Sequence, residues 1–180
     1  MKVAPLDAPS LTTERLLLRM LQESDFEEYS AIHTDAEVTK FTARAHLSRT
    51  ETWKHLAMIV GCWHLRGFGM WGVFEKDSGA LVGRVGFHQP DGWPDFELGW
   101  TIGRNWWGKG YASEAARRCV DFAFGEMGRD RLISLIDPLN VASIRVAERI
   151  GETLQGEFQL DEHRLLVYGI ERRARLQPAG

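Results

Sequence analysis

The segment from Phe96 to Phe124 constrains the fold more than any other part of the sequence. Residues 96–102 have the composition of a β-strand, and from Tyr111 onward apolar side chains recur at helical spacing, with charged side chains on the other side. A glycine-rich sequence, Gly-Arg-Asn-Trp-Trp-Gly-Lys-Gly at residues 103–110, joins the two. This order of strand, turn and amphipathic helix predicts an α/β domain with a helix N-terminus beside the sheet.

The rest of the chain alternates between predicted strands and helices. Further strands are expected at Thr12–Met20, Met70–Glu75, Leu81–Phe87 and Arg131–Ile136, and in a closing hairpin of Gly156–Leu160 and Arg164–Ile170. Further helices are expected around Phe26–Ile32, from the capping box Ser48-x-x-Glu51 to Trp63, and over Val141–Ile150, which Gly151 ends.

The chain length fits a single domain. Its 180 residues contain no linker, repeat or low-complexity segment, and one core is expected at this size. We therefore predict a leader at 1–11, one domain at 12–170 and a polar tail at 171–180.

Charge and composition argue against several classes of function. The net charge is −3 and no long run of Lys and Arg is present, which argues against nucleic-acid binding. The longest nearly apolar stretch, Ala57–Trp63, is far shorter than the ~20 residues of a membrane span, and the start lacks a signal-like segment. Cys62 and Cys119 lack metal-ligand spacing. We expect a cytoplasmic protein with no disulfide and no metal.

Three interpretations of the glycine-rich segments compete. Residues 67–72 fit the dinucleotide pattern GxGxxG, but they follow a predicted helix and enter a strand, whereas that pattern must link a strand to a helix. Residues 103–109 fit the GxxxxGK of a nucleotide-binding loop, but Gly110 stands where that loop needs Ser or Thr to bind magnesium. In the third interpretation, the backbone N–H groups at the start of the helix predicted from Tyr111 bind an anion. Gly108 and Gly110 would let a pyrophosphate approach the backbone closely.

The third interpretation agrees with a family resemblance. The sequence Trp107-Gly108-Lys109-Gly110-Tyr111-Ala112 resembles the phosphate-binding motif Gln/Arg-x-x-Gly-x-Gly/Ala of the GNAT superfamily of acetyl-coenzyme A-dependent N-acetyltransferases, with Trp107 in place of the opening Gln or Arg. The branch typified by RimJ/RimL ribosomal-protein N-terminal acetyltransferases is similar in further fragments, from 12 to 170. These are Thr13–Arg19, Glu97–Trp100, Asn140-x-x-Ser143 and Ala147–Gly151.

The resemblance implies a fold and a set of coenzyme contacts. It implies a single α/β domain with a mixed, mainly antiparallel sheet of about seven strands, splayed between the fourth and fifth, and about four helices. In the family the fourth strand bulges and its backbone pairs with the pantetheine arm; Gly99 would permit such a bulge. The implied acetyl-CoA contacts are Trp100, Ile102, Trp107, Gly108, Lys109, Gly110, Tyr111, Ala112, Asn140 and Ser143.

The same resemblance implies two catalytic residues. Glu97 is the candidate base for the acceptor ammonium. Many members carry a tyrosine as proton donor to the thiolate, but the matching position is Ala147, so Ser143 takes that role here. Glu152 replaces an aromatic residue after the glycine, a departure expected to affect packing only.

We therefore expect an enzyme that transfers the acetyl group of acetyl-CoA to a primary amine by direct attack in a ternary complex. The acceptor is a protein N-terminus or a small-molecule amine, and the protein is a possible homodimer. The alternative is a non-catalytic acyl-CoA sensor, which would keep Gly108, Gly110 and Asn140 but would need neither Glu97 nor Ser143.

Overall fold

The structure, a computed structural model, describes residues 8–42 and 47–172. Most of the predicted leader and tail therefore lies outside the described residues. The elements follow the chain in the order β1 (Leu11–Thr12), β2 (Leu16–Arg19), a 3-10 turn (Glu23–Asp25), α1 (Phe26–His33), α2 (Ala36–Thr39), α3 (Arg49–Arg66), β3 (Met70–Glu75), β4 (Leu81–His88), β5 (Glu97–Ile102), a 3-10 turn (Arg104–Trp106), α4 (Tyr111–Gly125), β6 (Arg131–Ile136), α5 (Val141–Ile150), β7 (Thr153–Leu160) and β8 (His163–Glu171).

Within the described residues the strands form one sheet of eight, in the order β1-β2-β3-β4-β5-β6-β8-β7. All neighbours are antiparallel except β5 and β6, which are parallel. The mixed, mainly antiparallel α/β fold is thus confirmed. The eighth strand arises because the predicted strand Thr12–Met20 is broken by a turn, in which the Thr13 N–H donates to the Leu16 carbonyl (3.0 Å). The short α2, capped by Asp35, was not predicted.

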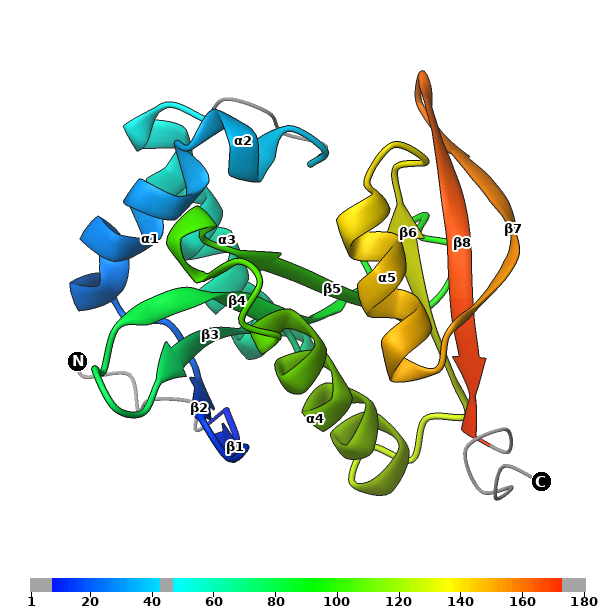
Figure 1. The fold of residues 1–180 in the computed structure, drawn as a ribbon, viewed down its shortest axis with the longest axis horizontal. Coiled ribbons are helices and arrows are strands. Elements are labelled where there is room, and N and C mark those ends of the chain that lie inside the picture. The colour runs from blue at the N-terminus through cyan, green and yellow to red at the C-terminus, as the bar shows by residue number, and fades with distance from the viewer. Residues whose placement is uncertain (1–7, 43–46, 173–180) are drawn as a thin grey trace.

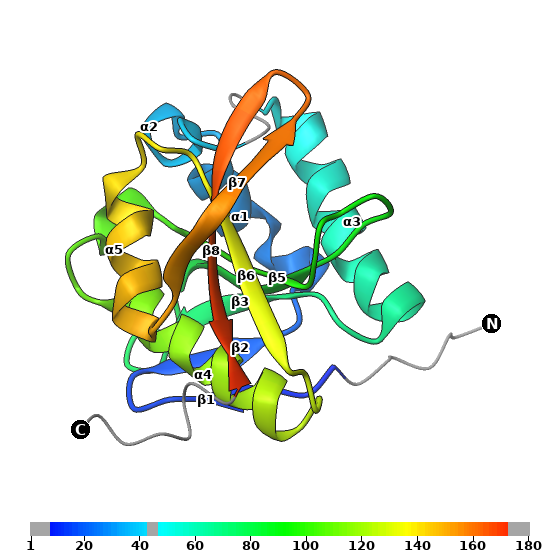
Figure 2. The same cartoon turned by 90° about the vertical axis from the view of Figure 1, so that its right-hand side faces the viewer.

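Helices cover both faces of the sheet (Figure 1). On one face, α1 and α3 pack against Met70 and Phe74 of β3. On the other face, α4 packs against Val73 and Leu98. Figure 2 shows α5 on one side of β6, β8 and β7. The N-terminus of α4 consequently lies near the end of β5, the arrangement that the glycine-rich turn predicts.

Strands β5 and β6 pair at a single position. Glu97 lies opposite Ile133, and the Ile133 N–H donates to the Phe96 carbonyl (3.1 Å). Beyond this position the two strands have no further paired residues. The predicted splay, between the fourth and fifth of the predicted strands, is confirmed at this point.

Side-chain hydrogen bonds end the ladder there. A regular parallel ladder would next pair the Leu135 N–H with the Leu98 carbonyl. Instead, the Leu98 carbonyl accepts a hydrogen bond from Ser134 Oγ (2.7 Å), and the Leu135 N–H donates to the Glu97 carboxylate. Both backbone groups are satisfied without a neighbouring strand, so the sheet opens at no cost in buried unpaired groups.

A buried carboxyl group contacts Ser134, one of the two residues that end the ladder. Glu152 is 2% exposed, and its Oε1 lies 3.0 Å from Ser134 Oγ. The Ser134 hydroxyl gives its single hydrogen to the Leu98 carbonyl, so the hydrogen in the second contact comes from the Glu152 carboxyl group. Burial, with a smaller contribution from the negative charge of Glu97, raises the pKa of Glu152 to about 8. The expectation that Glu152 affects packing only is therefore wrong, since it is a hydrogen-bonding neutral acid.

We predict that Glu152→Gln stabilises the protein more at pH 8 than at pH 5. The raised pKa means that the unfolded state loses a proton above pH ~4.5 while the folded state keeps it to about pH 8, so stability falls across this window. Glutamine keeps a donor to Ser134 and cannot ionise. Urea unfolding should show a gain of roughly 2–4 kcal/mol at pH 8 relative to pH 5. The exposed Glu148→Gln serves as control, and equal effects of Glu152→Gln at both pH values would contradict the assignment.

Candidate active site

A cavity of about 350 Å³ passes through the opening between β5 and β6. Its lining joins the α1–α3 face of the sheet to the α5 face. Four predicted site residues line it, although they come from β5 and from α5 with its preceding turn: Glu97, Trp100, Asn140 and Ser143. The tertiary fold thus gathers them in one place, which we take as the candidate active site.

Glu97 holds its carboxylate where the two strands separate. Trp93 Nε1 donates to Glu97 Oε2 (2.7 Å), and the Leu135 N–H donates to the same carboxylate. The surrounding protein displaces water and raises the pKa of Glu97 to about 7, against the opposing effect of both donors and of the Arg84 charge. A carboxyl group that ionises near neutrality is suited to general-base chemistry. No local feature of the sequence marks Trp93, one of seven tryptophans, as the partner of Glu97.

Ser143 lies across the opening in the first turn of α5. Its Oγ accepts a hydrogen bond from Trp100 Nε1 (3.3 Å), so the hydroxyl hydrogen is left to donate into the cavity. Asn140 is the N-cap of α5 and accepts from the Ser143 N–H through Oδ1 (3.1 Å). The cap orients Ser143, and it places the Asn140 side chain at the cavity wall.

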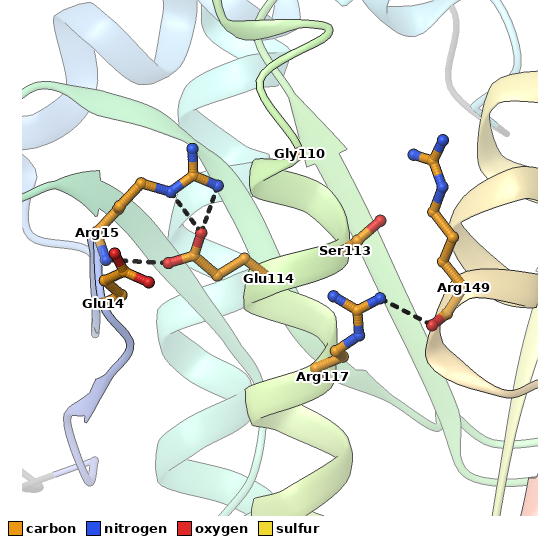
Figure 3. A pocket seen from close by; sticks show the side chains of 7 residues that line it. All are labelled: Glu14, Arg15, Gly110, Ser113, Glu114, Arg117 and Arg149. Carbon is orange, nitrogen blue, oxygen red and sulfur yellow. Dashed lines mark hydrogen bonds and ion pairs between the residues drawn. The ribbon is translucent and has the colours of Figure 1, made fainter. Parts of the chain in front are cut away.

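A second cavity, of about 400 Å³, lies beside the N-terminus of α4 (Figure 3). Gly110 caps this helix in the left-handed conformation, with φ +81°. Ser113 Oγ is buried and has no hydrogen-bond partner among the described residues. Arg117 and Arg149 also line the cavity, and the Arg117 guanidinium donates to the Arg149 carbonyl (3.0 Å). Free N–H groups, an unpartnered hydroxyl and two guanidinium groups together suit a phosphate-bearing ligand.

A third arginine at this cavity is already neutralised. Arg15 Nε donates to Glu114 Oε2 (2.7 Å), and Glu114 also accepts from the Arg15 N–H and the Thr13 hydroxyl. These contacts fix the β1–β2 turn to α4. Arg117 is exposed, in agreement with the charged side predicted for this helix. Helical spacing does not show that α5 lies alongside α4, so Arg149 was not predicted at this cavity.

Other predicted coenzyme contacts form the turn itself. Trp107 is 49% exposed, and its Nε1 donates to the Ile102 carbonyl (2.7 Å). Lys109 Nζ lies 4.4 Å from the centroid of the Trp106 ring. Gly108 has a φ of +77°, which favours glycine. These contacts explain the shape of the turn, and their role in coenzyme binding stays a prediction.

Tyr111 contributes to the core instead of a ligand-binding surface. Its side chain is 5% exposed and its hydroxyl donates to Glu75. The backbone of Tyr111 is left to contact a ligand at the helix N-terminus, where the adjacent Ala112 is half-buried.

The predicted bulge at Gly99 is wrong. Strand β5 pairs with β4 in unbroken register from Glu97 to Ile102. Glycine serves close packing there, since a Cβ at position 99 would lie 3.0 Å from Met70 Cε. The backbone of Phe96 faces β6, so by the two-residue period of a strand the N–H of Trp100 faces the opening. A regular strand therefore supplies a backbone donor at the opening without a bulge.

Within the described ranges, no group of three or more His, Cys, Asp or Glu side chains is arranged to hold a metal ion. None of the helices in those ranges is long and apolar enough to cross a membrane.

Comparison with known proteins identifies relatives of this chain. The sequence profile of the acetyltransferase (GNAT) domain matches residues 15–153. The uncharacterized protein YkkB of Bacillus subtilis is 33% identical over 150 residues, covering 78% of this chain and 83% of YkkB. The crystal structure of an acetyltransferase from Agrobacterium tumefaciens superposes with a TM-score of 0.83 at 30% identity, covering 95% of this chain and 99% of that one. A ribosomal-protein-S5-alanine acetyltransferase from Vibrio fischeri shares the fold, with a TM-score of 0.75 at 16% identity and coverage of 91% and 97%.

We predict that one glutamate titrates near pH 7. In carbon-13 NMR spectra of glutamate carboxyl groups, the signal that Glu97→Gln removes should have its midpoint near 7, because burial disfavours the charged form. Trp93→Phe removes a donor to the carboxylate and should raise this midpoint further. A midpoint close to the ordinary value for glutamate would contradict the described environment.

Proposed function

Because the chain belongs to the GNAT acetyltransferase family, we propose that it transfers the acetyl group of acetyl-CoA to a primary amine in a ternary complex. One observation carries the proposal: a carboxyl group with a pKa of about 7 and an oriented hydroxyl face the same cavity from opposite sides of the opening.

The residues present fit acetyl-CoA. The α4 N-terminus at Gly110, with Ser113, Arg117 and Arg149, would hold its phosphates. The exposed backbone edge of β5 beyond Leu98 would pair with the amide groups of its pantetheine arm, as a neighbouring strand would. When bound, the coenzyme supplies an acetyl thioester, which reacts with an amine without a covalent enzyme intermediate.

Each group at the opening has a defined chemical task. The Glu97 carboxylate takes a proton from the acceptor ammonium, which frees the nitrogen lone pair to form the new bond to the acetyl carbon. The Trp100 N–H, at the opening, is placed to donate to the acetyl oxygen as it gains negative charge. The Ser143 hydroxyl donates to the sulfur as the carbon–sulfur bond breaks, and the thiolate leaves.

A non-catalytic acyl-CoA sensor would also use the phosphate-binding end of this site. It would gain nothing from a carboxyl group held at a pKa of about 7 or from a hydroxyl fixed by Trp100, since neither contributes to phosphate binding. The presence of both favours the enzyme. Release of free thiol from acetyl-CoA, measured across a panel of amines and peptides, tests the choice.

We expect Gly110→Asp to weaken acetyl-CoA binding at least tenfold, because a carboxylate would face the phosphates. Gly110→Asn is the matched control: it has nearly the same shape and a similar tolerance of positive φ, but no charge. Isothermal titration of acetyl-CoA should show a much smaller loss for Asn than for Asp. Equal affinities of all three proteins would refute the phosphate site.

We expect Glu97→Gln to lower turnover about 10²-fold at neutral pH, with partial recovery at higher pH, where more of the amine is neutral. In the wild type, turnover should rise with pH through about 7 as Glu97 ionises. Ser143→Ala should also lower turnover but should keep that midpoint, because it removes a donor and leaves the base in place. Steady-state rates from pH 5.5 to 9.5 separate the two roles, and a wild-type profile in Glu97→Gln would exclude Glu97 as the base.

A further inference from the structure

An arginine without a carboxylate partner lies in the wall of the active-site cavity. Arg84 extends from β4, on the α1–α3 face of the sheet, and is partly exposed to the cavity. It forms no ion pair with any Asp or Glu in the part of the chain that the structure describes. Arginines are rarely buried without a counter-charge, because removal of water from an unpaired charge is costly.

The partners of Arg84 are electrically neutral. Its Nε donates to His33 Nε2 (3.1 Å), and its Nη1 contacts the Met70 sulfur. His33 uses Nδ1 on the Tyr29 carbonyl (3.0 Å). A ring that accepts at Nε2 and donates at Nδ1 carries one proton and no charge, and burial also holds the pKa of His33 well below its usual range. The imidazole therefore positions the guanidinium without neutralising it.

Arg84 and Glu97 lie at the two ends of one row of side chains. On this face of the sheet Arg84 lies opposite Thr101, Gly86 opposite Gly99, and His88 opposite Glu97. The central pair is two glycines, and the side chain of Met70, which pairs with Gly86, covers them. A Cβ at Gly99 would lie 4.0 Å from Glu97 Oε1 and 3.0 Å from the Met70 methyl group, and Arg84 contacts that same methionine. The cavity thus presents opposite charges at the two ends of this row, with the Met70 thioether between them.

Other charged groups at the cavity lie apart from this row. Lys40 follows α2, and Asp137 belongs to the turn before α5, where its Oδ1 accepts from the Leu139 N–H (2.8 Å). Neither residue belongs to the strand pair that holds Arg84 and Glu97.

We infer that the acceptor is a small primary amine that also carries a carboxylate, and that Arg84 binds this carboxylate while the amine lies at Glu97. The inference rests on the proposed function, since it names the substrate class of the same site. Guanidinium binds carboxylate through two parallel hydrogen bonds. A cavity of about 350 Å³ suits a small molecule. Diamines and polyamines would place a second positive charge against Arg84.

The test compares amines that differ only in the charge of the distant group. Each of 3-aminopropionate, 4-aminobutyrate and 6-aminohexanoate is paired with its carboxamide and with the diamine of matching length, and KM is measured by thiol release from acetyl-CoA. We expect the best carboxylate to have a KM roughly 10- to 100-fold below that of its carboxamide, the usual effect of a charged hydrogen-bonded pair. The diamine should be poorer still.

Two variants assign this preference to Arg84. Arg84→Gln should raise the KM of the carboxylate to that of the carboxamide and should leave acetyl-CoA binding unchanged. The matched control is Arg118→Gln, on α4, where Arg118 pairs with Glu126 away from the cavity. His33→Glu keeps Arg84 but supplies a counter-charge in place of the neutral ring, so it should also abolish the preference. Because the two changes act in different ways, the failure of one variant to fold leaves the other as a test.

The outcomes separate this inference from the proposed function. Equal KM values for carboxylate and carboxamide in the wild type, a preference for diamines, or acetylation of peptide N-termini regardless of charge would overturn the inference and leave acetyl transfer standing. A preference that persists in Arg84→Gln would also overturn it. A wild type that neither binds acetyl-CoA nor releases thiol with any amine would overturn both.

Discussion

The candidate active site depends on two side-chain hydrogen bonds that end the ladder between β5 and β6. Ser134 satisfies the Leu98 carbonyl, and the Glu97 carboxylate satisfies the Leu135 N–H. An open sheet would otherwise leave buried backbone groups unpaired, at about 1–3 kcal/mol each. Glu97, which takes part in ending the ladder, is also the candidate base. The buried acid Glu152 completes the arrangement by donating to Ser134.

The two cavities differ in the charge that they favour. Beside α4, two guanidinium groups, an unpartnered hydroxyl and a helix N-terminus favour negative charge, while Glu114 neutralises Arg15 at the edge. At the opening, the surrounding protein displaces water, and this raises the pKa of Glu97 toward neutrality. The proposed phosphate-binding site beside α4 and the poorly hydrated carboxyl group of Glu97 thus lie in two different cavities. In the proposed function, this separation would let the positive charge that binds phosphate coexist with a base that must accept a proton.

The sequence predicted local structure well, because its signals act over a few residues. The capping box at Ser48, the Asn140 cap and Gly151 mark helix ends through hydrogen bonds to neighbouring backbone groups. The failures are of two kinds. The bulge at Gly99 was carried over from the family, whereas here the register is regular and the glycine accommodates Met70. The break in the first strand is a turn closed by the Thr13 N–H on the Leu16 carbonyl, and Glu114, far along the chain, accepts hydrogen bonds from Thr13 and Arg15 of that turn.

By itself, the sequence determined the order of strands and helices, the glycine-rich N-terminus of α4 and the identity of Glu97 and Ser143 as candidates. Tertiary structure alone decided their partners. Trp93 and Leu135 set the state of Glu97, Trp100 orients Ser143, and α5 brings Arg149 beside Arg117. The physical reason is the separation along the chain of the groups that interact. Helical periodicity and caps depend on groups within about one turn of chain. The pKa of a carboxyl group depends on every atom that displaces its water, wherever that atom lies in the sequence.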